Sequence, residues 1–176
     1  NIMQVKLVSF SKPASEYEAE GIDDVQELIA FCARVSNPTA QINTDTSERL
    51  IRYLIKHQHW SPLEMVNACL EIKTTRDIAH QIVRHRSFSF QEFSQRYADP
   101  NLQQGDMFEY SEARLQDTKN RQNSIEVDDH VLQDEWTIRQ KAVAQAAKLN
   151  YDWAIERGIA KEQARKVLPE GLTKTT

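Results

Sequence analysis

The sequence predicts an α/β or α+β fold, a single domain in which a central, mostly antiparallel sheet is flanked by helices. Apolar residues alternate with polar ones in short segments, which is typical of strands. In longer segments they recur at helical spacing, and one such segment in the C-terminal half predicts a long helix. Strands and helices are mixed along 176 residues, a length that suits one domain with a sizeable core.

The first third of the chain predicts one strand and two helices. Residues 3–10 alternate at first and then become apolar on both faces, so we expect a strand that is half buried at its start and more buried at its end. Asp24 begins a helix, with Glu27 as its capping-box partner. The buried stripe of this helix is predicted to be Val25, Leu28, Ile29, Cys32 and Val35. A second helix begins near Asp45, again with a carboxylate three residues later, and ends before Pro62.

The middle of the chain predicts a strand over residues 65–73 and a helix over 75–86. Residues 87–97 alternate again, and we expect them to form a strand that leaves the helix end. Residues 99–128 are polar and predict a long loop. Loops of that length inside a compact domain are more often functional than idle.

The last third predicts a long helix over residues 129–157, with Gly158 as its C-cap, and a short helix over 160–168. The buried stripe of the long helix is predicted to be Leu132, Trp136, Val143, Ala146, Leu149 and Trp153. After the short helix the pattern predicts no closing strand before Thr176.

Composition narrows the class of protein. Hydrophobic residues make up 40% of the chain and charged residues 27%, which is ordinary for a soluble globular protein. The formal net charge is -4, so the surface as a whole repels nucleic acid and anionic membranes. No apolar run approaches the length of a membrane span, and no signal peptide opens the chain. We therefore expect a cytoplasmic protein, and any site for an anion must be local.

The two cysteines indicate neither a disulfide nor a metal site. Cys32 and Cys69 lack a CxxC partner, so we expect two reduced, buried thiols. His57 and His59 suggest a metal pair, but no third ligand accompanies them, and we expect no bound metal.

The segment from Arg84 to Tyr97, RHRSFSFQEFSQRY, concentrates cations and aromatic residues in an acidic chain. Cations that close a helix offset its dipole and are often simply solvated. The alternative is a ligand site, because a strand after the helix would carry Glu92, Ser94 and Arg96 on one face, where they and Arg84 could converge on a small anion. Spacing alone does not choose between the two.

The residue types fit a nucleotide or a phosphorylated cofactor. Guanidinium groups bind phosphate and stabilise negative charge that develops on a carbonyl oxygen. A glutamate beside them can accept an N–H hydrogen bond, and a serine can donate to a phosphate. Nothing in this composition specifies a reaction.

The Arg-His-Arg sequence followed after seven residues by Ser94 resembles the signature of the flavin-dependent thymidylate synthases. Further blocks are similar to segments of the same family and follow in the same order. They are HWSPLE (His59 to Glu64), QIVRHR (Gln81 to Arg86), EFSQR (Glu92 to Arg96), KNRQNS (Lys119 to Ser124) and ARKVLP (Ala164 to Pro169).

The resemblance implies an enzyme that converts dUMP to dTMP, a methyltransferase of nucleotide biosynthesis. Members take the methylene from methylenetetrahydrofolate and the hydride from FAD that NADPH has reduced. They are homotetramers with an α/β fold, and each active site draws residues from several subunits. Such a protein has no nucleic-acid or membrane partner and works in the cytoplasm, that of the host cell if it is viral.

Site residues follow from the same resemblance. The dUMP ligands would be Gln81, Arg84, Glu92, Ser94, Gln95, Arg96 and Arg165. The FAD ligands would be Ser61, Arg84, His85, Arg86 and Glu92. His59 would lie near the flavin and the folate. Arg84 and Ser94 are the catalytic candidates within this chain, although no histidine is placed to activate Ser94 as a nucleophile, so phosphate binding is its milder role.

Members of the family continue after the LP segment into a region that holds further FAD ligands and an arginine thought to favour ionisation of the bound uracil. We therefore expect residues 1–176 to form a single catalytic domain without that region, as a fragment or an ordered portion. Two other functions stay open. The chain could bind single-stranded nucleic acid through Phe88, Phe90, Phe93 and Tyr97, or it could be a non-catalytic nucleotide-binding subunit.

Overall fold

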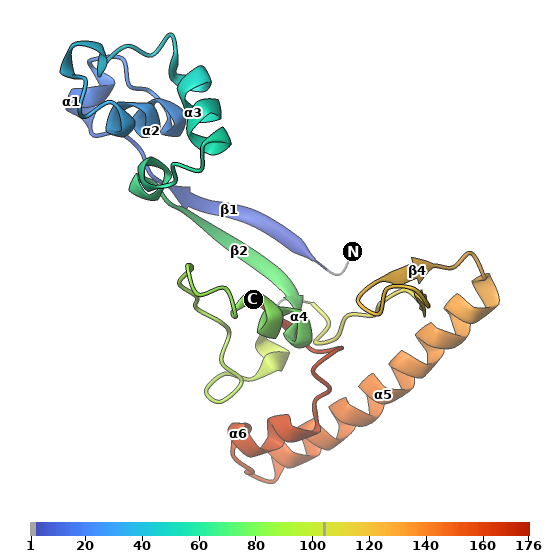
Figure 1. Cartoon of the computed structure of the whole chain (residues 1–176). Coiled ribbons are helices and arrows are strands. Elements are labelled where there is room, and N and C mark those ends of the chain that lie inside the picture. The colour runs from blue at the N-terminus through green and yellow to red at the C-terminus, as the bar shows by residue number, and fades with distance from the viewer. Residues whose placement is uncertain (1–2, 104) are drawn as a thin grey trace. The chain divides into compact units, whose positions relative to one another are not determined.

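A computed structural model describes residues 3–103 and 105–176 and has the predicted mixed α+β architecture (Figure 1). Lys6–Glu71 form one compact unit, and residues 3–5 with Ile72–Thr176 form the other. The helices are α1 Ser15–Glu18, α2 Val25–Ala33, η1 Pro38–Ala40, α3 Ser47–Lys56, η2 Ser61–Met65, α4 Arg76–Ile82, η3 Pro100–Leu102, α5 His130–Glu156, α6 Lys161–Ala164 and η4 Arg165–Val167. The strands are β1 Gln4–Phe10, β2 Ala68–Thr75, β3 Arg114–Gln116, β4 Ser124–Glu126 and β5 Lys174–Thr175.

The strands form a three-stranded sheet in the order β1-β2-β5 and a separate hairpin of β3 and β4. Strands β2 and β5 are antiparallel, with Thr74 opposite Thr175. The hairpin is also antiparallel, with Leu115 opposite Ile125. Neither β5 nor the hairpin was predicted, because a strand of two or three residues is too short to show an alternation.

In the unit Lys6–Glu71, helices α2 and α3 pack together around Ile29, Ala30 and Leu54. The predicted capping box of α2 is present: the Glu27 N–H donates to Asp24 Oδ1 at 2.8 Å, and the Asp24 N–H donates to a Glu27 carboxylate oxygen. The predicted start of α3 near Asp45 is correct to within two residues. That helix begins at Ser47, and no side chain caps it.

Strand β1 does not have the predicted burial. All seven of its residues are exposed, and Val8 retains 61% of its accessible surface. Cys69 in β2 is also exposed, contrary to the expectation of a buried thiol, although both cysteines are free as predicted. The described part of this single chain therefore does not cover the apolar side chains of β1.

Helix α4 ends at Ile82, four residues before the predicted end. The residues after it do not form the predicted strand, since residues 87–97 are turns and irregular backbone. The Tyr97 and Ala98 N–H groups both donate to the Ser94 carbonyl, which makes a turn where an extended strand was expected. The expectation that Glu92, Ser94 and Arg96 share one strand face is therefore wrong.

Helix α5 has the predicted length but a different buried face. Asp129 caps its start and Gly158 follows its end with a φ of 75°. The buried residues are Gln140, Ala144, Ala147, Tyr151 and Ala154. The large apolar residues of the predicted stripe are exposed or half-buried, and Leu149 and Trp153 retain 65% and 54% of their surface.

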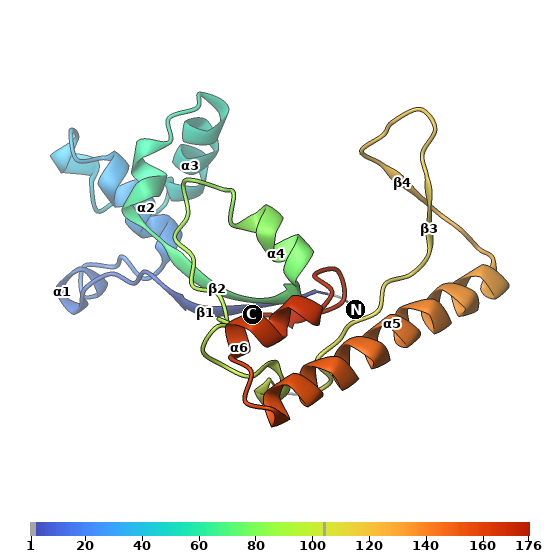
Figure 2. The same ribbon diagram turned by 90° about the horizontal axis from the view of Figure 1, so that it is seen from below.

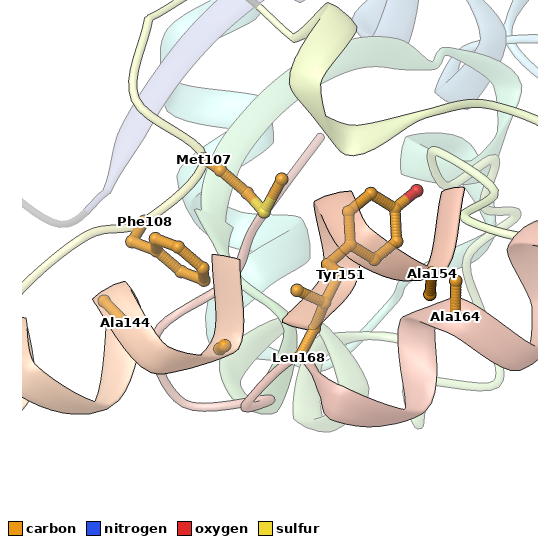
Figure 3. Close-up of a cluster of buried hydrophobic side chains, with 8 residues drawn as sticks. Met107, Phe108, Ala144, Tyr151, Ala154, Ala164 and Leu168 are labelled. Atoms are coloured by element: carbon orange, nitrogen blue, oxygen red, sulfur yellow. The ribbon is translucent and has the colours of Figure 1, made fainter. Parts of the chain in front are cut away.

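The core of the larger unit forms where α5 packs against α6, η4 and the segment that contains Met107 and Phe108 (Figure 3). Tyr151 is fully buried there. Burial raises the pKa of the Tyr151 hydroxyl to about 12, and the negative charge of Asp99 adds to the shift. The small alanine side chains of α5 allow these segments of the same chain to approach the helix closely. This explains why small residues lie on the inner face of α5.

Two glutamines of α5 hold the chain that leads into the hairpin. Gln140 accepts a hydrogen bond from the Ser111 N–H at 2.9 Å and donates to the Ser111 carbonyl at 2.8 Å. Gln133 does the same with the N–H and carbonyl of Ala113. Each side-chain amide thus takes the place of a neighbouring strand. The hairpin lies beside the N-terminal end of α5 (Figure 2).

We expect the substitution Gln140→Met to lower the free energy of unfolding by roughly 1–3 kcal/mol, because it leaves both backbone groups of Ser111 without their partner. Urea unfolding followed by circular dichroism measures this. The control is Gln163→Met, an exposed glutamine of α6, which should change the value by less than about 0.5 kcal/mol. Equal effects of the two substitutions would contradict the role given to Gln140.

Candidate functional site

Arg76 organises the region around the predicted site. It is the first residue of α4, and its side chain is only 11% exposed. Its Nη1 lies 3.3 Å from Glu92 Oε1 and its Nε lies 3.4 Å from Glu170 Oε2. A cation at a helix N-terminus opposes the helix dipole, so these two carboxylates supply the compensating charge.

Glu92 is fixed from a second direction by the end of the chain. Thr175 donates its hydroxyl hydrogen bond to Glu92 Oε1 at 2.9 Å. The N–H of the next residue, Phe93, donates to the Thr176 carbonyl at 2.9 Å. The segment that carries Glu92 is therefore tied to both α4 and β5.

Glu170 links the turn after η4 to the same node. Its backbone carbonyl accepts a hydrogen bond from the Asp77 N–H at 3.3 Å, and its carboxylate lies 3.5 Å from His80 Nδ1. Of the three residues at this node, only Glu92 was among the predicted site residues, and Arg76 and Glu170 were not. The available signal was an arginine in the first turn of a helix, a position that disfavours cations.

The Arg-His-Arg sequence lies in the turn after α4 and is exposed throughout. The Arg84 and His85 N–H groups donate to the carbonyls of Gln81 and Ile82, which continue the helix direction for one more turn. The His85 ring lies 5.6 Å from that of Phe88. Within the described residues, the side chains of Arg84 and Arg86 make no hydrogen bond or ion pair, so their charge is available to a ligand.

The loop that follows contains a buried amide. Gln95 is 3% exposed, and its Nε2 has no hydrogen-bond partner among the described residues. A buried N–H without a partner costs free energy, and a bound ligand can remove that cost. Ser94 is half-buried beside it, and Gln81 is exposed in the last turn of α4.

Arg96 and Arg165 come together at one residue of α6. Arg96 Nε lies 3.5 Å from a carboxylate oxygen of Glu162, and Arg165 Nε donates to the Glu162 carbonyl at 3.3 Å. Lys161 donates to the Tyr97 carbonyl at 3.2 Å and holds the loop from the same helix. Three cationic residues therefore contact this corner, and guanidinium and ammonium groups are donors that suit a phosphate.

The remaining predicted residues, Ser61 and His59, lie in the compact unit Lys6–Glu71. Ser61 begins η2 and is exposed. His59 is exposed near Tyr53 and His57, and the Tyr53 and His57 rings are 4.2 Å apart. Gln58 between the histidines has a φ of 57°, a conformation that costs free energy for a residue other than glycine.

The donor set fits an anionic, planar ligand better than a metal. Unpaired arginines, a buried amide and a carboxylate can bind the phosphate and ring edge of a nucleotide or the ring of a flavin. Nowhere in the described part of the chain do three His, Cys, Asp or Glu side chains gather closely enough to hold a metal ion. A hollow of about 410 Å³ lies between α5 and residues 110–112 and 127–129, and none of the predicted site residues lines it.

Comparison with known proteins agrees with this chemistry. The chain is 48% identical over 172 residues to the probable flavin-dependent thymidylate synthase of Paramecium bursaria Chlorella virus 1, an alignment of 95% of this chain and 74% of the relative. It is 44% identical over 167 residues to the flavin-dependent thymidylate synthase of Synechocystis sp., and this alignment also covers 95% of this chain and 74% of the relative.

A solved structure has the same fold. The UMP/dUMP methylase PolB from Streptomyces cacaoi, crystallised with 5-Br dUMP, matches with a TM-score of 0.74 and 25% identity over 98% of this chain and 70% of that protein. A family profile described as thymidylate synthase complementing protein matches residues 19–176. The chain belongs to this family, Thy1.

Proposed function

We propose that this protein is a flavin-dependent thymidylate synthase, an enzyme that methylates dUMP to dTMP with FAD as cofactor. The observation that carries the proposal is the pair of unneutralised arginines, Arg84 and Arg86, in an acidic chain that belongs to the Thy1 family. Relatives at 48% and 44% identity bear that enzyme's name. Methylenetetrahydrofolate and NADPH complete the proposed reaction as co-substrates.

The proposed dUMP site uses the loop after α4 and the adjoining α6–η4 corner. Arg96 and Arg165 bind the phosphate, and Ser94 donates a hydrogen bond to it rather than acting as a nucleophile. Glu92, Gln95 and Gln81 bind the ring edge. Because Glu162 already pairs with Arg96, an arriving phosphate exchanges with that carboxylate.

The proposed FAD site uses the Arg-His-Arg turn together with Ser61 and Glu92. When bound, FAD supplies the hydride. Arg84 and Arg86 stabilise the negative charge that builds on the substrate and on the reduced ring, and His85 contributes a planar surface. In this proposal His59 lies near the flavin and the folate, and residues 1–176 belong to a single catalytic domain.

The same proposal includes a homotetramer with shared active sites. Helix α5 has an apolar stripe on the side opposite its buried face, consisting of Val131, Ile138, Leu149 and Trp153, which are 54–69% exposed. Strand β1 is exposed as well. Contiguous apolar surface of this kind marks a contact with another chain.

Within residues 3–103 and 105–176, no helix combines the length and apolar character needed to cross a bilayer.

We expect the protein to retain a flavin absorbance band after incubation with FAD and removal of free cofactor. Calorimetry should also detect dUMP binding to the loaded protein. Visible spectroscopy and dUMP titration measure the two ligands separately. A protein that stays colourless and binds oligonucleotides in a salt-sensitive manner, unaffected by dUMP, would favour the nucleic-acid alternative instead.

The substitution Arg84→Ala should weaken the binding of both FAD and dUMP by about tenfold or more, because it removes a charged donor common to the two sites. The fold should persist, since the side chain is exposed and unpaired. A suitable control is Arg52→Ala, which removes an exposed arginine that pairs with Glu48 of the same helix. Unchanged ligand binding in the Arg84→Ala protein would show that the site lies elsewhere.

The double substitution Leu149→Asp and Trp153→Asp should shift the assembly from a tetramer to smaller species, because it places charge on the apolar stripe of α5. Light scattering coupled to gel filtration reports the mass. Lys141→Asp, off that stripe, should leave the mass unchanged. Persistence of the wild-type mass in the double variant would exclude this stripe as the contact.

A further inference from the structure

We propose that Thr175 is a positioning residue for the substrate site. Its hydroxyl, together with the guanidinium of Arg76, holds the Glu92 carboxylate in the orientation that receives dUMP. The inference rests on the proposed function through the role given there to Glu92. It adds two residues that touch neither substrate nor cofactor and that act through Glu92.

The two donors converge on the same oxygen of Glu92. Thr175 Oγ1 donates to Oε1 at 2.9 Å, and Arg76 Nη1 reaches that oxygen at 3.3 Å. The other oxygen, Oε2, accepts no hydrogen bond from the described residues. The Glu92 side chain is 26% exposed, so one oxygen is anchored while the carboxylate still reaches the surface. An anchored carboxylate with one free oxygen can accept an N–H bond from a ligand without first losing rotational freedom.

The hydroxyl of Thr175 has a specific role in the strand, the hydrogen bond to Glu92. The residue is 2% exposed, and a buried hydroxyl needs a partner. Valine would fill the same space and suits a strand as well. Its neighbour across the ladder, Thr74, is equally buried at 4%, yet its hydroxyl has no partner in the described structure. The bond to Glu92 therefore distinguishes Thr175 from a threonine that only fills space.

Arg76 is suited to hold Glu92 in a single position. Its Nη1 donates a hydrogen bond to Glu92, and its Nε lies in ion-pair distance of Glu170 without a hydrogen bond among the described residues. A lysine would keep the charge but could not reach both carboxylates in this geometry. The carboxylate of Glu92 thus receives one neutral donor and one charged donor from two rigid elements.

The test compares dUMP affinity across matched variants of the FAD-loaded protein. Thr175→Val, which keeps shape and removes the hydroxyl, should weaken dUMP binding about tenfold, the size of one hydrogen bond to a charged group. Thr175→Ser should restore affinity to within about twofold, and Thr74→Val should bind dUMP like the wild type. Arg76→Lys should weaken binding in the same direction. FAD occupancy and thermal unfolding are measured for every variant.

A double-mutant cycle separates positioning from a general structural role. In a Glu92→Ala background, Thr175→Val should have no further effect on dUMP affinity, whereas a purely structural defect would persist there. Wild-type affinity in Thr175→Val or in Arg76→Lys, no rescue by serine, or an undiminished loss in the Glu92→Ala background would each overturn the inference.

The two levels of proposal fail differently. A wild-type protein that does not bind dUMP overturns the proposed function and the inference with it. A wild-type protein that binds dUMP, with equal binding in the Thr175→Val protein, overturns the inference alone. If the Thr175→Val protein does not fold, the other two variants still test the inference. Wild-type dUMP affinity in Arg76→Lys would contradict it, and so would a tenfold loss of dUMP affinity in Thr175→Ser.

Discussion

The nearly buried guanidinium of Arg76 is the constraint on which the candidate site depends. A charge with so little exposure needs partners, and it takes them from the loop after α4 and from the turn before β5. Three segments that are distant in the sequence are thereby tied together. Arg76 takes up the carboxylates of Glu92 and Glu170, and the side chains of Arg84 and Arg86 have no ion pair among the described residues.

A second constraint acts along α5. Its inner face carries alanines and two glutamines, and its outer face carries large apolar side chains. Gln140 and Gln133 bind the backbone groups of Ser111 and Ala113, which lie outside any strand of the described structure. The small and polar residues of α5 therefore contact other segments of the same chain. Its apolar stripe on the opposite side is what a protein that works as an assembly of several copies would present.

Local rules predicted the elements that rest on neighbouring residues. The capping box of Asp24 and Glu27 and the glycine after α5 both appear as expected. Each depends on contacts within four residues. The same rules failed at Asp45, where the side chain does not cap the helix, and at residues 87–97, where the alternation of phenylalanines did not make a strand. A strand needs a partner, and the pattern of one segment does not supply it.

For the site, residue types and their order were enough to mark the arginines, the serine and the glutamate as a group with a chemistry for nucleotides and to indicate the family. The sequence pattern did not predict how these residues are arranged in space. The folded chain alone decides that Glu92 is anchored by Arg76 and Thr175, that Gln95 is buried and that Arg96 meets Arg165 at Glu162. These contacts span up to 83 positions in the chain. Composition and periodicity record which side chains are present and which face they share, whereas long-range packing determines which of them meet.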